Sequence, residues 1–401
     1  MTTVTSRRWA PIAVIILIAV MLSACAGGPP PATSWSGLVV SGETAYLAAT
    51  DRIYAIDTNR KTPNSNRLLW SFPPLDQNAS VTFHGQPALS ENGILLAGSD
   101  SLTGKGAIVA LDTTQIIEAL SEGTTVRQTA KPQWSYPPDD TTQQPGSIFG
   151  GVAYDGKSIY AATNDGHVLA LDAQAGALNW VFTATQRIWS SPVVSGSVVY
   201  AASQDHTLYA LNAANGSIQW TFTAGAMSPG TPTVYGNTVY FGALDNKVYA
   251  VNATTGEQRW TFDAQGWVWD GPILFDNVLY FGTLQGELYA LSREGTPVWS
   301  QPLKLVDSGG IRAQPLVTQD VMYVPTLGRK LFAIDRATQT IKWTFTTLQD
   351  GEQLLTTPVL VGELILAAPL PSGGSPVRLY AVDAESGNLV WRYPAPETQQ
   401  P

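Results

Sequence analysis

The sequence predicts an all-β protein, an eight-bladed β-propeller built from four-stranded antiparallel blades. Two observations support this prediction. A phrase close to Tyr-Ala-Leu-Asp-Ala-x-x-Gly-x-x-x-Trp-x-Phe occurs eight times, most clearly at 169–182, 209–222, 249–262 and 380–393. The tryptophans that close the phrase recur at intervals of 39 to 64 residues, at Trp70, Trp134, Trp180, Trp220, Trp260, Trp299, Trp343 and Trp391. A period of about 40 residues with several short strands per unit is typical of propellers.

Each unit begins with a predicted β-hairpin. In the fourth unit, residues 190–200, two apolar runs flank a Ser-Gly pair, which is a hairpin pattern. A proline and a tyrosine eight residues apart mark this hairpin, at Pro192/Tyr200, Pro232/Tyr240, Pro272/Tyr280 and Pro315/Tyr323. A second hairpin follows through polar turns such as 164–166 and 245–247. The unit is therefore four strands, A to D from the channel outward.

The residues of the repeated phrase have distinct physical roles. Its Asp or Asn side chain can accept backbone N–H bonds two residues on, and the glycine supplies a positive φ, at Gly176, Gly216, Gly256 and Gly387. The tryptophan is large enough to fill the wedge between neighbouring blades. Eight complete sets of strands lie between Trp35 and Tyr393, so we expect the ring to close without exchanging a strand; an early strand that completes the last blade is the alternative.

One segment departs from the repeat. Residues 114–122, TQIIEALSE, lie in the connection between strands C and D of the second unit. Their sequence predicts a short helix on the face opposite the channel mouth described below.

The N-terminus predicts export and lipidation. Arg7 and Arg8 precede an apolar stretch, 12–21, that is too short to span a bilayer comfortably. The following Leu-Ser-Ala-Cys resembles a bacterial lipobox, in which Cys25 is lipidated. We expect a signal peptide at 1–24, Cys25 with a Gly/Pro-rich tether at 25–34, the propeller at 35–393 and a tail at 394–401. An ordinary secretory peptide is the alternative.

Composition limits the partners. The net charge is −9, and removal of residues 1–24 takes away two arginines and no acidic residue, which leaves −11. An acidic protein with few charged residues is not suited to nucleic acid, so none is expected. Cys25 is the only cysteine, so no disulfide forms within the chain.

The channel mouth is the predicted binding site. Loops on a rigid scaffold commonly carry binding residues. The connections from strand D to the next strand A share one face of the ring with the B–C turns, and they lead into the innermost strand, which lines the channel. The residues three positions before the strand A proline, or its equivalent, are Trp35, His84, Phe149, Trp189, Pro229, Trp269, Arg312 and Leu355. Arg187, Trp267 and Asp270 adjoin this ring. Exposed aromatic residues with arginine are typical of binding hot spots, whereas a ring that simply plugs the channel is the alternative.

A metal site is not predicted. His167 and His206 lie in B–C turns of adjacent blades, near Asp165 and Asp205, but the alignment offsets the two histidines by one residue. The polarity of turns accounts for them better than metal ligation.

The repeated Ala-x-Asp/Asn-x-x-x-Gly-x-x-x-Trp resembles the tryptophan motif of quinoprotein-type propellers, the pyrroloquinoline quinone (PQQ)-like repeats, over nearly all of 35–393. With its lipobox, short tether and eight blades, the chain is similar to the BamB lipoproteins of outer-membrane β-barrel assembly. That resemblance implies a scaffold, anchored to the outer membrane and facing the periplasm, that binds an envelope protein, possibly a β-barrel assembly protein. In a host without an outer membrane, the outer face of the plasma membrane is expected.

Two other functions share this architecture. Tryptophans around a concave mouth also suit a small ligand or a glycan. Quinoprotein dehydrogenases have the same fold, and resemblance to them implies a vicinal Cys-Cys disulfide, a Ca²⁺ site with Glu and Asn, and a catalytic Asp. One cysteine cannot form that disulfide, and Asp270 is a lone carboxylate beside Trp269. We therefore predict no enzyme, no cofactor and no metal.

Overall fold

A computed structural model describes residues 36–74, 81–101, 104–120, 126–138, 145–370 and 377–394. The chain divides into two units, 1–33 and 34–401, and every described residue belongs to the second. The predicted signal peptide, Cys25, the tether and Trp35 lie outside the described residues, as does the tail beyond Pro394. Among the described residues, no helix is long and apolar enough to cross a membrane.

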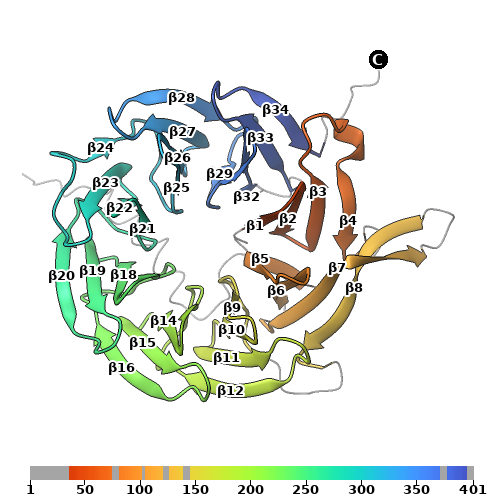
Figure 1. Ribbon diagram of the computed structural model, residues 1–401, viewed down its shortest axis with the longest axis horizontal. Coiled ribbons are helices and arrows are strands. Elements are labelled where there is room, and N and C mark those ends of the chain that lie inside the picture. Colours follow the sequence, from red (N-terminus) through yellow and green to blue (C-terminus); the bar gives the residue numbers. More distant parts are fainter. Residues whose placement is uncertain are drawn as a thin grey trace, which may run out of the picture. The chain divides into compact units, whose positions relative to one another are not determined.

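The described strands form eight four-stranded antiparallel sheets arranged in a ring, which confirms the predicted propeller (Figure 1). Blade 1 contains β1 (Gly37–Ser41), β2 (Thr44–Ala49), β3 (Arg52–Asp57) and β4 (Leu68–Phe72). Blade 2 contains β5 (Val81–Leu89), β6 (Ile94–Ser101), β7 (Ala107–Leu120) and β8 (Val126–Tyr136). Blade 3 contains β9 (Ala153–Tyr154), β10 (Ser158–Ala162), β11 (His167–Asp172) and β12 (Leu178–Thr183). Blade 4 contains β13 (Val193–Ser195), β14 (Val198–Ala202), β15 (Thr207–Asn212) and β16 (Ile218–Thr223).

The second half of the ring repeats this order. Blade 5 contains β17 (Thr233–Tyr235), β18 (Thr238–Gly242), β19 (Lys247–Asn252) and β20 (Gln258–Asp263). Blade 6 contains β21 (Ile273–Phe275), β22 (Val278–Gly282), β23 (Glu287–Ser292) and β24 (Leu303–Lys304). Blade 7 contains β25 (Leu316–Val317), β26 (Val321–Pro325), β27 (Lys330–Asp335) and β28 (Ile341–Thr346). Blade 8 contains β30 (Val359–Val361), β31 (Leu364–Ala367), β33 (Leu379–Asp383) and β34 (Leu389–Tyr393).

Two short additions accompany the blades. A two-stranded sheet pairs β29 (Gln353–Leu354) with β32 (Pro369–Leu370), and a 3-10 turn, η1 (Asn64–Asn66), precedes β4. The carboxylate of Glu352, next to β29, is fully buried and accepts hydrogen bonds from Arg378 at 2.7 Å and from Tyr380 at 2.9 Å. This buried ion pair fastens the added sheet to blade 8.

The repeated tryptophan joins each blade to the next, as predicted. In five junctions the indole nitrogen donates to a backbone carbonyl of the following blade, over distances of 2.8 to 3.1 Å. The turn glycine of that following blade packs on the same indole and has a φ between 68° and 82°. A Cβ on these glycines would lie 2.5 to 2.8 Å from the ring, in the pairs Trp134/Gly176, Trp180/Gly216, Trp220/Gly256, Trp260/Gly295 and Trp343/Gly387. The glycine thus serves both the turn and the junction.

The ring closes between blades 8 and 1 by a different contact. Each of these blades is a continuous segment, so no strand is exchanged, as predicted. The guanidinium of Arg67 lies 4.1 Å from the ring of Trp391 and is only 1% exposed. It donates to the carbonyl oxygens of Asp57, Asn59 and Thr62 at 3.0, 3.0 and 2.6 Å. A cation over the indole face replaces the glycine used at other junctions.

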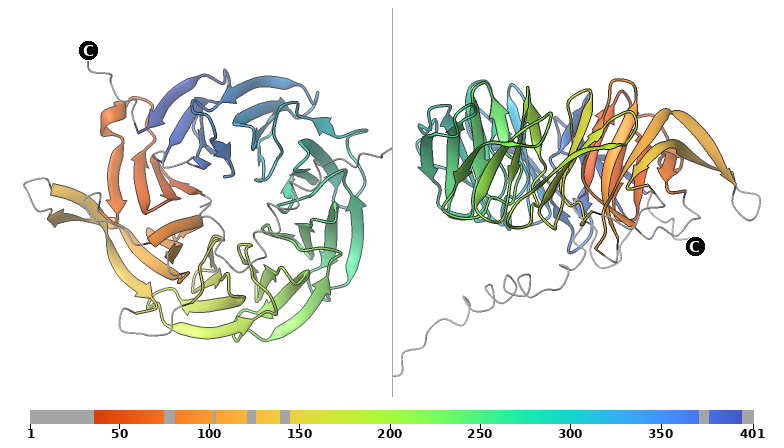
Figure 2. Two further views of the ribbon diagram at one scale, coloured as in Figure 1. Left: turned by 180° about the vertical axis from the view of Figure 1, so that it is seen from behind. Right: turned by 90° about the horizontal axis from the view of Figure 1, so that it is seen from below.

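The predicted helix at 114–122 is wrong. Residues 114–120 continue β7, and they pair with β8 from Ile116↔Ala130 to Leu120↔Val126. The hairpin extends from the edge of blade 2 (Figure 2). β-Branched residues on both strands favour this ribbon, and long-range pairing outweighs the helical pattern of Ile-Ile-Glu-Ala-Leu.

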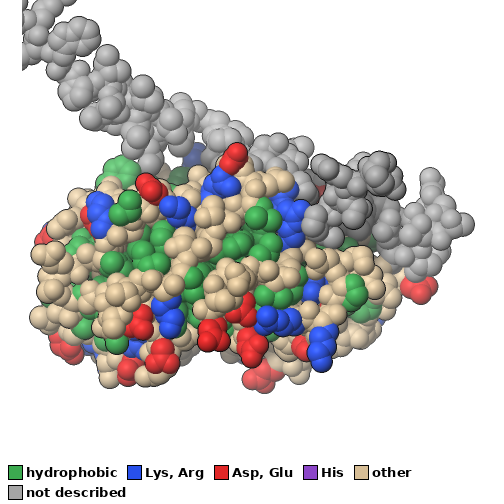
Figure 3. Space-filling model, turned by 90° about the horizontal axis from the view of Figure 1, so that it is seen from above, with side chains coloured by type: hydrophobic (Ala, Val, Ile, Leu, Met, Phe, Trp, Pro, Cys, Tyr) green, Lys and Arg blue, Asp and Glu red, His purple; other side chains and the backbone are tan. Residues whose placement is uncertain are grey.

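The outermost strands leave part of their apolar side chains exposed at the edge of the ring. Leu178, Ile218, Ile341 and Leu389 occupy this position in four blades. Along the edge seen in Figure 3, apolar side chains lie between charged ones. These residues provide exposed positions, far from the channel, for control substitutions.

Candidate functional site

Two adjoining cavities lie at the predicted mouth and against the inner strands of the ring. At the mouth, a cavity of about 120 Å³ is lined by residues that precede the strand A of each blade. A larger cavity of about 480 Å³ lies beyond it, against the innermost strands. The two cavities share lining residues, namely Gln86, Gly151, Ser191, Thr231, Asp270 and Thr357. The two cavities therefore adjoin along these residues.

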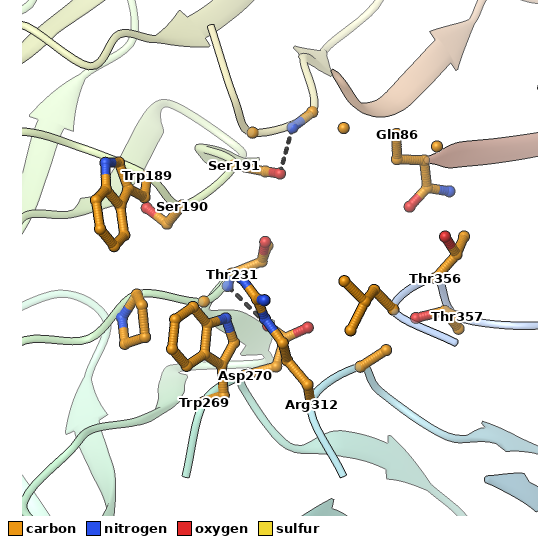
Figure 4. A pocket seen from close by; sticks show the side chains of 18 of the residues that line it. Gln86, Trp189, Ser190, Ser191, Thr231, Trp269, Asp270, Arg312, Thr356 and Thr357 are labelled. Atoms are coloured by element: carbon orange, nitrogen blue, oxygen red, sulfur yellow. Dashed lines mark hydrogen bonds between the residues drawn. The ribbon is translucent and has the colours of Figure 1, made fainter. Parts of the chain in front are cut away.

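The most concentrated group at the mouth comes from blades 6 and 7. The guanidinium of Arg312 lies 3.9 Å from the ring of Trp269, and both side chains are half-buried (Figure 4). Asp270 follows Trp269 and accepts hydrogen bonds from the N–H groups of Thr231 at 2.8 Å and Gly271 at 2.9 Å. The carboxylate therefore links blades 5 and 6 at the mouth.

Burial alters the acidity of this pair. It raises the pKa of Asp270 to about 6, against the opposing effect of the two N–H donors and of Arg312. Burial likewise lowers the pKa of Arg312 to about 10, while Asp270 acts in the opposite direction. Because Arg312 remains charged at neutral pH, the mouth offers a cation stacked on an indole beside a carboxylate.

Trp189 occupies the corresponding position in blade 4. It lines the mouth cavity, and its indole nitrogen donates to Oδ1 of Asn164 at 2.9 Å. Asn164 belongs to the B–C turn of blade 3. This bond holds the indole across the junction of two blades, so that one face of the ring is available at the mouth.

Arg187 and Trp267 lie on the same face but outside the channel lining. The carbonyl of Arg187 accepts a bond from the N–H of Gln204, and the carbonyl of Trp267 accepts one from Leu284. Both contacts join a D–A connection to a B–C turn, as the predicted arrangement of faces requires. Arg187 lines a separate groove of about 360 Å³ with Asp165 and other polar residues. Thus Trp189 and Trp269 line the mouth cavity and Arg187 lines the groove, whereas Trp267 lines neither.

His84 and Phe149 do not line the cavities. They pack edge to face against each other, with ring centroids 5.2 Å apart. His84 is 2% exposed, and neither of its ring nitrogens has a hydrogen-bond partner among the described residues. The nearest carboxylate, Asp100, is 3.9 Å away, beyond hydrogen-bonding distance. Burial lowers the pKa of His84 to about 4, so the imidazole is neutral. At blades 2 and 3, His84 and Phe149 therefore pack within the wall of the channel and do not line its mouth.

The histidines of the B–C turns serve those turns. Nδ1 of His167 lies 3.0 Å from Asp165, and Asp205 accepts hydrogen bonds from Thr185, Thr207 and Tyr209. Within the described ranges, no group of three His, Cys, Asp or Glu residues could hold a metal ion.

The sequence interpretation missed a second ring inside the first. The residue immediately before the strand A proline is Gln86, Ser191, Thr231, Gln314 or Thr357 in five blades, and these side chains give the channel hydroxyl and amide groups. Nε2 of Gln314 donates to the carbonyl of Gly271 at 2.9 Å, which links blades 6 and 7. The same alignment on the strand A proline, advanced by two positions, would have revealed this ring.

The channel lining does not fit a quinone with Ca²⁺. Calcium takes about six to eight oxygen ligands, commonly including several carboxylates. Asp270 is the one carboxylate among the described residues that line the two channel cavities, and one of its oxygens already accepts two backbone N–H groups. The remaining polar groups are neutral hydroxyls and amides, or the cation of Arg312.

The architecture recurs in solved structures. BamB from Moraxella catarrhalis is 19% identical, with a TM-score of 0.51, over 60% of this chain and 71% of that one. The computationally designed Ika8 protein is 14% identical, with a TM-score of 0.62, over 89% and 95%. A europium-containing methanol dehydrogenase is 15% identical, with a TM-score of 0.62, over 83% and 82%. At such identities the likeness shows the fold alone.

Sequence comparison is more specific. No protein of curated function matches this chain. The family model described as outer membrane protein assembly factor BamB matches residues 114–263 and 244–401, which together make up more than half of the sequence. This chain belongs to the family of the outer membrane protein assembly factor BamB.

Proposed function

We propose that this protein is a lipid-anchored, extracytoplasmic scaffold that binds envelope proteins through its loop-bearing face and catalyses no reaction. The observation that carries the proposal is the set of aromatic and arginine side chains on that face, with Trp269 stacked under Arg312 and Trp189 held at the mouth. Aromatic residues and arginine dominate the energetics of protein interfaces. The family description, an outer membrane assembly factor, supports a β-barrel assembly protein as the partner.

Arg187 supports the same surface. Its side chain is half-buried beside the groove of about 360 Å³ and has no ion-pair or hydrogen-bond partner among the described residues. A guanidinium with unused donors can bind a carboxylate in a bidentate geometry. The partner surface is therefore expected to place an acidic side chain at Arg187 and apolar groups at the neighbouring tryptophans.

The anchor is the second part of the proposal. The lipobox-like sequence ending at Cys25 would attach the chain to a membrane, and the Gly/Pro-rich residues 26–34 would form a tether. The outer membrane, with the propeller in the periplasm, agrees with the family description. Replacement of Cys25 by Ser should abolish metabolic labelling with a palmitate analogue. Continued labelling of that variant would contradict lipidation at this residue.

The binding surface can be tested by in-cell cross-linking, mild solubilisation, pull-down and mass spectrometry. We expect recovery of a β-barrel assembly protein with the wild-type lipoprotein, and at least about ten-fold less with the triple variant Arg187→Ala, Trp189→Ala, Trp269→Ala. The matched control is Ile218→Ala with Leu389→Ala, because both side chains lie on the outer edge of the ring. Equal recovery from a triple variant that keeps its circular dichroism spectrum would rule out this surface.

A small ligand or glycan is the second candidate, because the channel combines aromatic faces with a ring of hydroxyl and amide groups. Such a lining suits a sugar, whose faces stack and whose hydroxyls exchange hydrogen bonds. Addition of cell-wall glycans should then change the tryptophan fluorescence in a saturable way. This change should be absent from the variant Trp269→Ala. Dye-linked alcohol oxidation in the presence of PQQ and Ca²⁺ is the corresponding test of the dehydrogenase alternative, for which no activity is expected.

A further inference from the structure

The hairpin of β7 and β8 extends beyond what the ring requires. β7 has 14 residues, whereas the corresponding strand β15 of blade 4 has six. Pairing between β6 and β7 ends at Ile94↔Asp112, followed by one bond from the N–H of Thr113 to the carbonyl of Gly93 at 2.9 Å. From Thr114 onward, β8 is the one strand that pairs with β7 in the described part of the chain. Figure 2 shows this ribbon standing clear of the blades.

The two edges of the ribbon are protected to different extents. β8 carries Lys131 and Pro132, and both residue types discourage a further strand from pairing. Close to the ring, Ala130 of β8 is fully buried in the hydrophobic core that it shares with Tyr46 and Trp70 of blade 1. The outer edge of β8 is therefore protected next to the ring, at Thr129 and Ala130 by burial and at Lys131 and Pro132 by residue type.

The edge of β7 has neither protection. Residues 114–118 are Thr-Gln-Ile-Ile-Glu, with no lysine and no proline, and all five are exposed. Ile116 and Ile117 are 40% and 42% exposed and point to opposite faces of the ribbon, since successive residues alternate along a strand. In an antiparallel pair, every second residue directs its N–H and C=O away from the partner strand. The N–H of Thr114 is already used, because it donates to Oδ1 of Asp112 at 2.9 Å. From Ile116 onward, β7 thus presents unused backbone donors and acceptors beside two exposed isoleucines.

We propose that this edge, Ile116–Glu118, binds an extended segment of another protein by adding it to the hairpin as a further β-strand. The unpaired backbone fixes the conformation of the ligand, and the isoleucines favour apolar or β-branched residues on both of its faces. Glu118 is the one charged side chain on the edge, so a neutral or basic segment fits it. A second copy of this chain fits less well, because its Glu118 would lie near the first Glu118. The two chains would also repel each other, since each carries a net charge of −9.

This surface is separate from the channel mouth, so the proposal goes beyond the proposed scaffold function and does not depend on it. The triple variant at the mouth should retain binding at β7, and a variant at β7 should retain capture through the mouth. Failure of either proposal can therefore be recognised without the other.

The test uses the full-length lipoprotein in mild detergent and a synthetic nonapeptide of alternating valine and threonine with a lysine at each end. Amide hydrogen exchange should slow by about ten-fold at the N–H groups of residues 116–118 that point away from β8 when the peptide is added. A matched peptide with alternate amide nitrogens methylated has the same side-chain sequence but lacks the backbone donors, and it should give no protection.

Three substitutions complete the design. Ile116→Lys and Ile117→Lys, on opposite faces of the ribbon, should each weaken peptide binding by about five-fold or more, because lysine on an edge opposes strand addition. Ile218→Lys, an exposed isoleucine of the outer strand β16, should leave it unchanged. Equal protection by the methylated peptide, or no protection by either peptide, would refute strand addition. Protection that rises with protein concentration without peptide would instead assign the edge to a second copy.

Discussion

The packing of tryptophan on glycine at the junction between blades can be tested by adding a single methyl group to the glycine. In Gly216→Ala the added Cβ would meet Cε3 of Trp180 at 2.5 Å, and the residue would keep a φ of 72°. The left-handed conformation costs a non-glycine residue about 1 kcal/mol, and relief of the overlap adds about 1–3 kcal/mol. We therefore expect the free energy of unfolding to fall by about 2–4 kcal/mol.

A second glycine separates the two contributions. Gly196, in a turn of blade 4, has a φ of 59°, and a Cβ placed there would have no neighbour within 4 Å. Gly196→Ala should therefore cost only the conformational part, about 1 kcal/mol. Urea unfolding followed by far-ultraviolet circular dichroism measures both variants. Equal losses of stability would show that the indole does not constrain the glycine. If the reasoning holds, Trp180→Leu should reduce the cost of Gly216→Ala to that of Gly196→Ala.

Three further predictions concern the contribution of buried polar side chains to stability, namely the imidazole of His84, the guanidinium of Arg67 and the carboxylate of Glu352. Because burial holds the folded-state pKa of His84 at about 4, below its usual 6.5, its stabilising contribution is complete above pH 6.5 and declines on acidification. The free energy of unfolding should fall by about 3 kcal/mol as the pH is lowered to near 4. His84→Leu should remove that part of the pH dependence, which urea titrations at successive pH values would measure. Arg67→Ala should cost about 3 kcal/mol by equilibrium unfolding, and Arg67→Lys should recover less than half, since an ammonium can neither stack on Trp391 nor reach three carbonyls. Glu352→Gln should lower the free energy of unfolding by about 3 kcal/mol, because the charge of Arg378 stays buried without its counterion. If the double variant Glu352→Gln, Arg378→Met is no more stable than the single one, the loss does not arise from that charge.

The repeat could be predicted because its signals are local and occur many times. The glycine and tryptophan of each phrase, and the proline at each strand A, give the same strand assignment in blade after blade, so errors in one blade are corrected by the others. Even the faces of the ring follow from strand order, and contacts such as Gln204 with Arg187 agree with them.

What could not be predicted depends on contacts between distant residues. Residues 114–120 have a pattern compatible with a helix, and only their pairing with β8 decides for a strand. His84 occupies a mouth position in the alignment, but its side chain turns into the wall against Phe149. Trp299 keeps its spacing, but it lies outside a strand, since the segment that leads to β24 is irregular. The alignment of the repeats predicts on which face of the ring a residue lies, whereas the direction of its side chain depends on the residues that surround it in the folded protein.

The absence of strand exchange at closure has a consequence for how such a chain can be rearranged. Because blades 1 and 8 are each complete, the position at which the polypeptide starts is independent of the ring. A circular permutant that joins residue 394 to residue 36 through a short linker, and opens instead between blades 4 and 5, should rebuild the same eight sheets. In such a permutant the proposed anchor would precede a different blade, while the mouth residues kept their order. The proposed point of attachment and the proposed binding face are therefore separable traits, which selection or design can vary one at a time.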